Sequence, residues 1–294
     1  MSVVLFFIDG LGIGTRGVHN PLDGLEGAEP LAVFQDEEPS LPFDGILART
    51  DATLGVEGRP QSASGQTTIL TGVNAPLHLG YHKQGFPNKA LLEIIEEHSI
   101  FLRLKRTGIE PNTFANAYTR RFFDERPRWV SATTAAMQAA GMRFRDLEDL
   151  RRGRAVFQDF TNQMLTERGE EAPIRTPEEA GRILAELSRE HRFTLYEYFI
   201  TDKIGHLQEM ERARVVLKAL AEMLRTLLAN LDLKRTTLLV TSDHGNIEDL
   251  SSRNHTLNKV PTLVWGAQAE RVARRIKSLA DITPAIVETL EAEA

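Results

Sequence analysis

The chain has 294 residues, 41% hydrophobic and 26% charged, ordinary values for a soluble globular protein with one large domain or a core carrying a modest insertion. The net charge of −6 gives no overall basic field for a polyanion, so we expect no nucleic-acid partner. Cysteine is absent, which excludes disulfides, thiolate ligands, cysteine nucleophiles and a cysteine-derived formylglycine, so a metal site must use His, Asp, Glu or hydroxyl ligands.

The first predicted element is a strand. Residues 2–8, SVVLFFI, form a short β-branched apolar run, which is typical of a buried parallel strand and ends at Asp9. The run is too short for a secretory or membrane-spanning segment. We therefore expect a cytoplasmic protein that has no membrane partner.

The next elements alternate between helix and strand. Residues 66–72 predict a short helix, opened by the Ser-Ala-Ser-Gly turn before it. Residues 88–107 predict a second helix that stops at Gly108, and residues 113–118 predict the next strand. The order strand, helix, strand indicates a doubly wound α/β sheet.

The pattern changes between residues 119 and 191, where Arg and Glu are frequent and the periodicity is mostly helical. We interpret this stretch as a small helical insertion or lid on a core made of residues 1–118 and 192–294. The core pattern then resumes with a strand at 193–200, an amphipathic helix at 207–231, strands at 236–243 and 260–266, and two closing helices.

Acidic residues stand at the ends of three predicted strands. Asp9 ends the first and Asp202 follows the strand before the long helix. Asp243 and His244 end the next strand, and His255 lies in the loop after it. Ligands of open α/β sheets bind beyond the carboxyl ends of the strands, so these side chains are expected to converge. Buried charges need a partner, and Asp with His suits Zn or Mn.

The spacing of Asp202 and His206 adds to this prediction. The two residues are four apart, which places both side chains on one face if a helix begins there. Each motif alone also fits an ordinary surface turn or a solvated histidine. Their joint placement at strand ends is what favours a metal site.

Four motifs resemble those of the alkaline phosphatase superfamily of metalloenzymes: DGLG from Asp9, DKIGH from Asp202, SDHGN from Ser242 and HTLNKVP from His255. The branch that they resemble most is that of cofactor-independent phosphoglycerate mutase and phosphopentomutase. The resemblance covers residues 1–75 and 195–294. It implies an α/β fold of alkaline phosphatase type, with a doubly wound, mostly parallel sheet and a small helical insertion.

The resemblance also implies two neighbouring divalent ions, Mn or Zn, with Mg possible. By motif, Asp202, His206 and His255 would hold one ion. The other would be held by Asp9, Asp243 and His244, with the nucleophile bridging toward it from the segment between the first strand and the first core helix.

The nucleophile is a Ser or Thr at a helix start in this family. Aligning ILTG, which ends at Gly72, with the family's helix places Ser64 there as nucleophile and metal ligand; Ser62, Thr67 and Thr68 are alternatives. The positive end of a helix dipole favours an alkoxide and an incoming phosphate. A Ser at this place can also be a simple N-cap. The sequence departs from the mutases, whose motif continues Gly-His where this chain has two threonines.

Several basic residues are candidates for binding a substrate phosphate. The planar fork of Arg can bind two phosphate oxygens at once. Each candidate also fits a solvated basic face. The candidates are Arg120 and Arg121 after the 113–118 strand, then Lys83, His78, His82 and Lys203.

These features together predict a two-metal phosphohydrolase that cleaves a small phosphate ester through a phosphoserine intermediate. A phosphomutase is the first alternative, but the phosphoglycerate mutases carry a far larger insertion than this chain has room for. A diesterase or a phosphonate-acting enzyme also fits the family. A metal-binding member without catalysis is the alternative from a different class. The sequence leaves the substrate and the oligomeric state open.

Overall fold

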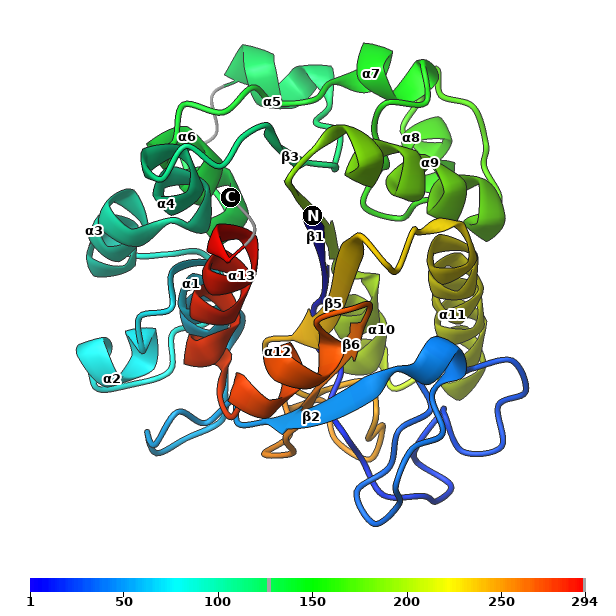
Figure 1. The fold of residues 1–294 in the computed structure, drawn as a ribbon. Coiled ribbons are helices and arrows are strands. Elements are labelled where there is room, and N and C mark those ends of the chain that lie inside the picture. Colours follow the sequence, from blue (N-terminus) through cyan, green and yellow to red (C-terminus); the bar gives the residue numbers. More distant parts are fainter. Residues whose placement is uncertain (126–127, 293–294) are drawn as a thin grey trace.

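A computed structural model describes residues 1–125 and 128–292, and a six-stranded sheet lies at its centre (Figure 1). Its strands lie in the order β2-β6-β5-β1-β4-β3, and β6 alone runs in the direction opposite to the other five. The predicted α/β fold with a mostly parallel sheet is therefore confirmed. The strands are β1 (Ser2–Ile8), β2 (Ile46–Thr50), β3 (Asn112–Phe114), β4 (Phe193–Tyr198), β5 (Thr236–Ser242) and β6 (Val260–Trp265).

Helices cover both faces of the sheet, and α5, α7 and α8 lie beyond β3 (Figure 1). No helix of the described residues is long and apolar enough to cross a membrane. The helices are α1 (Ser62–Thr71), α2 (Ala75–Leu79), α3 (Lys89–His98), α4 (Ile100–Arg106), α5 (Arg120–Glu125), α6 (Ala132–Ala139), α7 (Leu147–Arg151), α8 (Gln163–Glu167), α9 (Pro177–Glu190), α10 (Ile200–Leu207), α11 (Met210–Asn230), α12 (Ala269–Arg275) and α13 (Ile282–Glu291).

Strand β1 is apolar and buried at every position after Ser2 because of its place in the sheet. Successive side chains of a strand point to opposite faces. Val3, Leu5 and Phe7 join the apolar cluster that includes side chains of α1, α3, α4, α6 and α13. Val4, Phe6 and Ile8 join the cluster formed with α9 and α11. These positions lie between two helical layers and have no solvent face, so all of them are apolar.

The predicted elements differ from the structure in several places. Strand β2 was not predicted, because it is a short edge strand that contains Arg49. The helix predicted over residues 88–107 is divided at Ser99, whose hydroxyl donates to Ala136 O at 2.8 Å. Helix α1 begins at Ser62, so residues 62–65 form its first turn rather than a turn before it.

The strand predicted over residues 113–118 is shorter than expected, and a side chain continues its pairing. Regular pairing of β3 with β4 ends at Phe114. Beyond it, Asn116 Nδ2 donates to Glu197 O at 2.8 Å, and Glu197 N donates to Asn116 Oδ1 at 3.0 Å. The Asn116 amide therefore takes the place of a peptide group in the ladder and fixes the end of β4.

The stretch between residues 119 and 191 contributes to both layers of the core. Helix α6 lies in the cluster of α1, α3 and α4, and α9 packs along α11 in the other. Residues 126–127 of this stretch lie outside the described residues. A separate small cluster joins Ala117 to residues that lie between the two helices in sequence, namely Leu147, Leu150, Ala155, Phe157 and Leu165.

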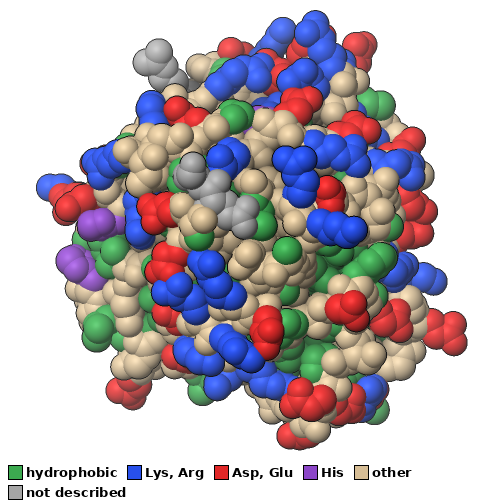
Figure 2. Space-filling view, in the orientation of Figure 1, with side chains coloured by type: hydrophobic (Ala, Val, Ile, Leu, Met, Phe, Trp, Pro, Cys, Tyr) green, Lys and Arg blue, Asp and Glu red, His purple; other side chains and the backbone are tan. Residues whose placement is uncertain are grey.

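Charged side chains of both signs are interspersed over the face shown in Figure 2. Basic side chains alternate with acidic ones there, in keeping with the net charge of −6.

Candidate metal centre

The three strand-end carboxylates meet at one edge of the sheet. Strands β5, β1 and β4 are neighbours and run parallel, so their carboxyl ends lie together. Asp9 directly follows β1, Asp243 directly follows β5, and Asp202 lies in the first turn of α10 after β4. Parallel pairing thus brings together residues that are far apart in the sequence.

Asp9, Asp243 and His244 form one possible ligand set. Each offers one ligand atom within 4.8 Å of the others, and all three residues are buried. His244 Nε2 lies 3.2 Å from Asp9 Oδ1 and 3.6 Å from Asp243 Oδ2. This is the set that the motifs imply for one of the two ions.

A second set lies beside the first and shares His244 with it. Ligand atoms of Asp202, His244 and His255 lie within 4.8 Å of one another. His206 is at the rim, with Nε2 3.3 Å from Asp202 Oδ2 and 3.4 Å from His255 Nε2. The structure therefore brings together six of the seven residues predicted as ligands, and Ser64 is the exception. His244 lies between the sets, and its ring stacks on that of His255 at 3.6 Å between centroids.

Two of the histidines are oriented by backbone carbonyls. His255 Nδ1 lies 2.8 Å from Pro60 O, and His206 Nδ1 lies 2.7 Å from Arg253 O. A carbonyl oxygen only accepts, so each Nδ1 carries a proton, and each Nε2 is the ring nitrogen left for a carboxylate or a metal ion. Metal-ligating histidines are commonly fixed in this way, and both Nε2 atoms face the carboxylates.

The electrostatics of the site call for a cation. Burial raises the pKa of Asp243, and Asp9 adds to the rise. Burial lowers the pKa of His244, but Asp243 and Asp9 outweigh it and raise the value to about 10. Burial opposes the ionised form of Asp202 too, but the hydrogen bond from His255 keeps its pKa below the usual range. Asp9 Oδ1 is buried without a hydrogen-bond partner among the described residues. Clustered buried carboxylates with imidazoles fit divalent ions.

Two amide side chains that the sequence analysis did not single out hold the carboxylates. Gln66 Nε2 donates to Asp9 Oδ2 at 3.2 Å and to Asp243 Oδ2 at 3.3 Å. Asn246 Nδ2 donates to Asp202 Oδ1 at 2.7 Å. Both residues could have been found from the sequence. Asn246 belongs to the SDHGN motif, and Gln66 follows Ser62 by one helical turn, which places the two side chains on the same face of a helix.

Gly10 allows β1 and α10 to approach closely enough to form the site. Its φ of +75° favours glycine, and a Cβ there would lie 2.9 Å from Asp202 Cα. A larger residue would therefore separate Asp202 from Asp9.

The structure brings Ser62 rather than Ser64 to the ligand sets. Ser62 is the first residue of α1, and its Oγ lies 3.0 Å from His244 Nε2. Ser64 is fully buried; its hydroxyl donates to Gln61 O at 3.2 Å and accepts from Lys83 N at 3.1 Å. Two residues along an α-helix correspond to a rotation of about 200°, so the two side chains leave α1 in nearly opposite directions.

The two threonines considered as alternatives are also turned away. Thr67 Oγ1 donates to Ala63 O at 2.7 Å, and Thr68 Oγ1 donates to Ser64 O at 2.8 Å. Both bonds are made within α1, and both residues are fully buried.

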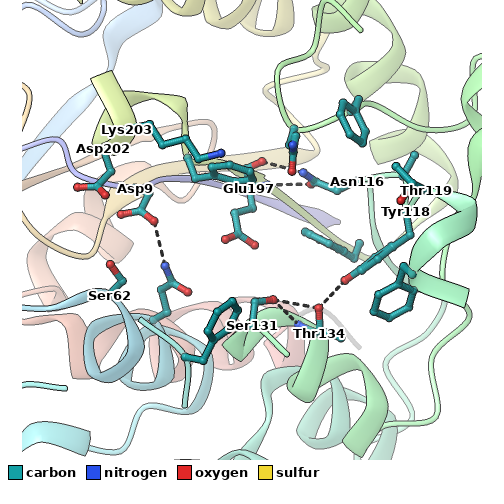
Figure 3. Close-up of a pocket in the computed structure, with 18 of the residues that line it drawn as sticks. Asp9, Ser62, Asn116, Tyr118, Thr119, Ser131, Thr134, Glu197, Asp202 and Lys203 are labelled. Atoms are coloured by element: carbon teal, nitrogen blue, oxygen red, sulfur yellow. Dashed lines mark hydrogen bonds between the residues drawn. The ribbon is translucent and has the colours of Figure 1, made fainter. Parts of the chain in front are cut away.

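A cavity of about 550 Å³ opens beside the carboxylates. In Figure 3, Asp9, Ser62 and Asp202 lie on one side of it and Tyr118 and Thr134 on the other, with Glu197 directed into the space between them. Six aromatic residues contribute to its lining: Phe86, Phe114, Tyr118, Phe122, Phe157 and Phe199.

The basic residues of the cavity differ in part from those expected. Lys203 and Arg168 line it. Arg120 and Arg121 are exposed on α5 outside this lining, and Arg121 pairs with Glu125 at 2.7 Å. Lys83 Nζ donates to Gln84 O at 2.6 Å, also outside the lining. Arg168 lies at the end of the short helix α8, where no sequence pattern pointed to a site.

Glu197 is a further carboxyl group that faces the cavity. Burial raises its pKa to about 7; a hydrogen bond with Thr133 opposes the rise and Asp9 adds to it. This carboxyl therefore titrates near neutral pH. It lies within β4 rather than at a strand end, so the reasoning that found Asp9 did not reach it.

Comparison with known proteins agrees with this geometry. Residues 173–294 match the family described as the Metalloenzyme superfamily. The 2,3-bisphosphoglycerate-independent phosphoglycerate mutase of Picosynechococcus sp. is 30% identical over 114 residues, which are 34% of this chain and 22% of that protein. The match thus spans less than a quarter of the mutase.

The fold is also found in solved structures. The alkaline phosphatase from the Antarctic bacterium TAB5 superposes with a TM-score of 0.52 at 12% identity, covering 100% of this chain and 99% of that one. A cold-active alkaline phosphatase from Shewanella sp. gives a TM-score of 0.55 at 11% identity, covering 99% and 100%. The family match over residues 173–294, the mutase relatives and the shared fold support the resemblance of the chain to the alkaline phosphatase superfamily and to its cofactor-independent phosphoglycerate mutase branch.

Proposed function

We propose that the protein is a metal-dependent phosphohydrolase that cleaves a small phosphate ester through a phosphoserine intermediate on Ser62. The observation that carries this proposal is the position of Ser62 Oγ, 3.0 Å from His244 Nε2 at the start of α1. The positive end of the helix favours both an alkoxide and a bound phosphate. Ser62 thus replaces Ser64 as the proposed nucleophile.

The ligand sets support a centre for two divalent ions. We assign Asp202, His206 and His255 to one ion and Asp9, Asp243 and His244 to the other. Mn or Zn suits imidazole and carboxylate ligands, whereas Mg binds imidazole poorly. When bound, the two ions would stabilise a serine alkoxide and the charge on the phosphoryl oxygens.

Each residue of the site has its own role in the proposed reaction. Ser62 Oγ releases its proton to solvent and forms a bond to phosphorus as the bond from phosphorus to the ester oxygen breaks, and the alcohol leaves after taking a proton from solvent. Water then attacks the phosphoserine, releasing phosphate and restoring the serine hydroxyl. Lys203 and Arg168 line the same cavity and supply positive charge for the phosphoryl group.

Trapping the intermediate tests this proposal. The Mn-loaded protein is mixed with 4-nitrophenyl phosphate, quenched in acid during turnover and digested for mass spectrometry. We expect phosphate on Ser62 in the peptide that spans residues 60–72. Release of phosphate without any phosphopeptide would instead indicate direct attack by water. No release from any ester by Mn- or Zn-loaded protein would reject the hydrolase.

A phosphomutase is the second candidate, because the curated relatives carry that name. Turnover in ¹⁸O-labelled water separates the two reactions. A hydrolase places ¹⁸O in released phosphate, whereas a mutase moves the phosphoryl group between hydroxyls without releasing it. A protein that binds two ions and does neither would be the non-catalytic family member.

A further inference from the structure

We propose that the cavity selects a phosphate monoester whose alcohol part ends in an aromatic ring. The inference rests on the proposed function for the phosphate end of the ligand. The preference for an aromatic ring is inferred from the size and lining of the cavity.

The first observation is size. The cavity has a volume of about 550 Å³. Pockets of roughly 300–1,000 Å³ enclose ligands of drug size. A phosphate carrying only two or three carbons would leave most of this space filled with water, so the site has room for a larger alcohol part.

The second observation is an aromatic wall opposite the metal ligands. The rings of Tyr118 and Phe122 lie 4.3 Å apart between centroids. Phe144 supports both from behind, at 4.9 Å from Tyr118 and 5.3 Å from Phe122. Tyr118 and Phe122 line the cavity, whereas Phe144 does not. Supported rings that face a cavity offer a planar ligand offset or edge-to-face contacts.

The third observation is that four polar side chains near this wall, those of Tyr118, Thr134, Ser131 and Asn116, already have partners. The Tyr118 hydroxyl is bonded to Thr134 Oγ1 at 2.9 Å, which in turn contacts Ser131 Oγ at 2.9 Å. The amide of Asn116 is engaged by the backbone of Glu197 through both its oxygen and its nitrogen. These groups have little hydrogen-bonding capacity left for a ligand rich in hydroxyls. The wall therefore favours an apolar, planar group over a sugar.

The fourth observation is the separation of charge from apolar surface. Asp9, Ser62 and Asp202 lie at one side of the cavity, and Tyr118 lies at the other (Figure 3). Lys203 belongs to the first side, where its Nζ lies 4.4 Å from the centroid of the Phe199 ring. A monoester would thus bind in one direction, with phosphate at the metal ligands and its ring against Tyr118 and Phe122.

Binding of two phosphonates tests the inference without turnover. In 3-phenylpropylphosphonate and propylphosphonate a P–C bond replaces the ester bond, and the two differ only in the ring. Each is titrated calorimetrically into the Zn-loaded protein. We expect the phenyl compound to bind at least about tenfold more tightly, as burial of a ring predicts. Equal affinities would overturn the inference.

Two neighbouring residues of α5 provide a variant and its matched control. Phe122 lines the cavity, whereas Phe123 is 43% exposed and outside the lining. We expect Phe122→Ala to lose most of the preference for the phenyl compound while keeping its affinity for propylphosphonate. Phe123→Ala should retain the preference. Equal loss in both variants, with unchanged melting curves, would contradict the role of this wall.

Turnover of 2-phenylethyl phosphate and ethyl phosphate then separates this inference from the proposed function. Both esters release a simple primary alcohol, so a difference between their turnover rates measures the effect of the aromatic ring. Phosphonate selectivity without turnover would reject the hydrolase and keep the ligand class. Turnover without phosphonate selectivity would keep the hydrolase and reject the ligand class.

Discussion

Ser62 Oγ and His244 Nε2 lie 3.0 Å apart although 182 positions separate the two residues. The contact joins the first turn of α1 to the loop after β5. It places a hydroxyl where the two ligand sets meet, with Gln66 one turn further along the same helix.

Replacing Ser62 tests this relationship most directly. Ser62→Ala should lower kcat by on the order of a thousandfold or more, because the group that bonds to phosphorus is lost. Metal content, measured by atomic emission, should stay at the parent level because six other side chains remain. Ser64→Ala is the matched control: it should keep turnover and lose roughly 1–3 kcal/mol of stability, since Lys83 N loses its acceptor. The reverse result would return the nucleophile to Ser64.

Metal content should respond separately at the two ligand sets. We expect two divalent ions per chain, with Asp243→Asn and His206→Ala each losing one. His206 is at the exposed rim, so its variant should recover the ion at higher metal concentration, whereas Asp243 is fully buried and its variant should not. His78→Ala, on the surface of α2, is the control and should bind both ions. Unchanged content in both ligand variants would exclude the assigned centre.

Activity should disappear when the ions are removed. Exhaustive dialysis against a chelator should abolish phosphate release, and Mn or Zn should restore it better than Mg because imidazole is a poor ligand for Mg. Phosphate release is measured with and without each metal. A rate indifferent to chelation would show that hydrolysis does not use the centre.

Glu197 should titrate near neutral pH in the metal-free protein. Burial raises its pKa from 4.5 to about 7 in the folded state. The folded state therefore holds the proton more tightly than the unfolded chain does, and the stability from this group is lost as pH rises from about 4.5 through about 7. Denaturant unfolding should show the parent losing stability relative to Glu197→Gln over this range. A constant difference would mean that the carboxyl is not shielded from water.

The two cations of the cavity should govern substrate affinity. Lys203→Ala and Arg168→Ala should raise KM, and they should lower kcat less if their contacts are equal in the ground and transition states. Arg120→Ala and Arg121→Ala should leave both constants near the parent values, because these residues are exposed outside the cavity lining. Steady-state kinetics on 4-nitrophenyl phosphate measures all four variants. A raised KM in the α5 variants alone would restore the expectation drawn from the sequence.

The sequence brings together the residues of the two candidate ligand sets better than it places the rest of the site, for a physical reason. Parallel strands end at one edge, so Asp9, Asp202 and Asp243 could be brought together from strand order alone. The choice between Ser62 and Ser64 depends on where a helix begins. The composition of residues 62–65 predicts a loop turn, whereas these residues form the first turn of helix α1. A nucleophile position that is wrong by two residues along a helix points in nearly the opposite direction.

The lining of the cavity could not be predicted from the sequence, for a different reason. Its aromatic wall comes from the short helix α5 and the segment before it, and Arg168 comes from the end of α8. Short helices carry too few residues for a periodic pattern. Asn116 adds a further obstacle, because its side chain replaces a backbone pairing that no propensity describes.

The contribution of the 119–191 stretch to both layers of the core limits how this protein can be engineered. Helix α6 packs on one face of the sheet and α9 on the other, so excising the stretch as a unit would expose apolar surface on both sides. A graft intended to exchange ligand preference should therefore leave α6 and α9 in place and keep Val156 and Phe160, which join the core of α9 and α11. It should replace only the residues of the small cluster between the two helices and their neighbours, including Leu150, Phe157 and Leu165. Modularity in this molecule thus exists at the scale of a loop with its own small core, rather than at the scale of a domain.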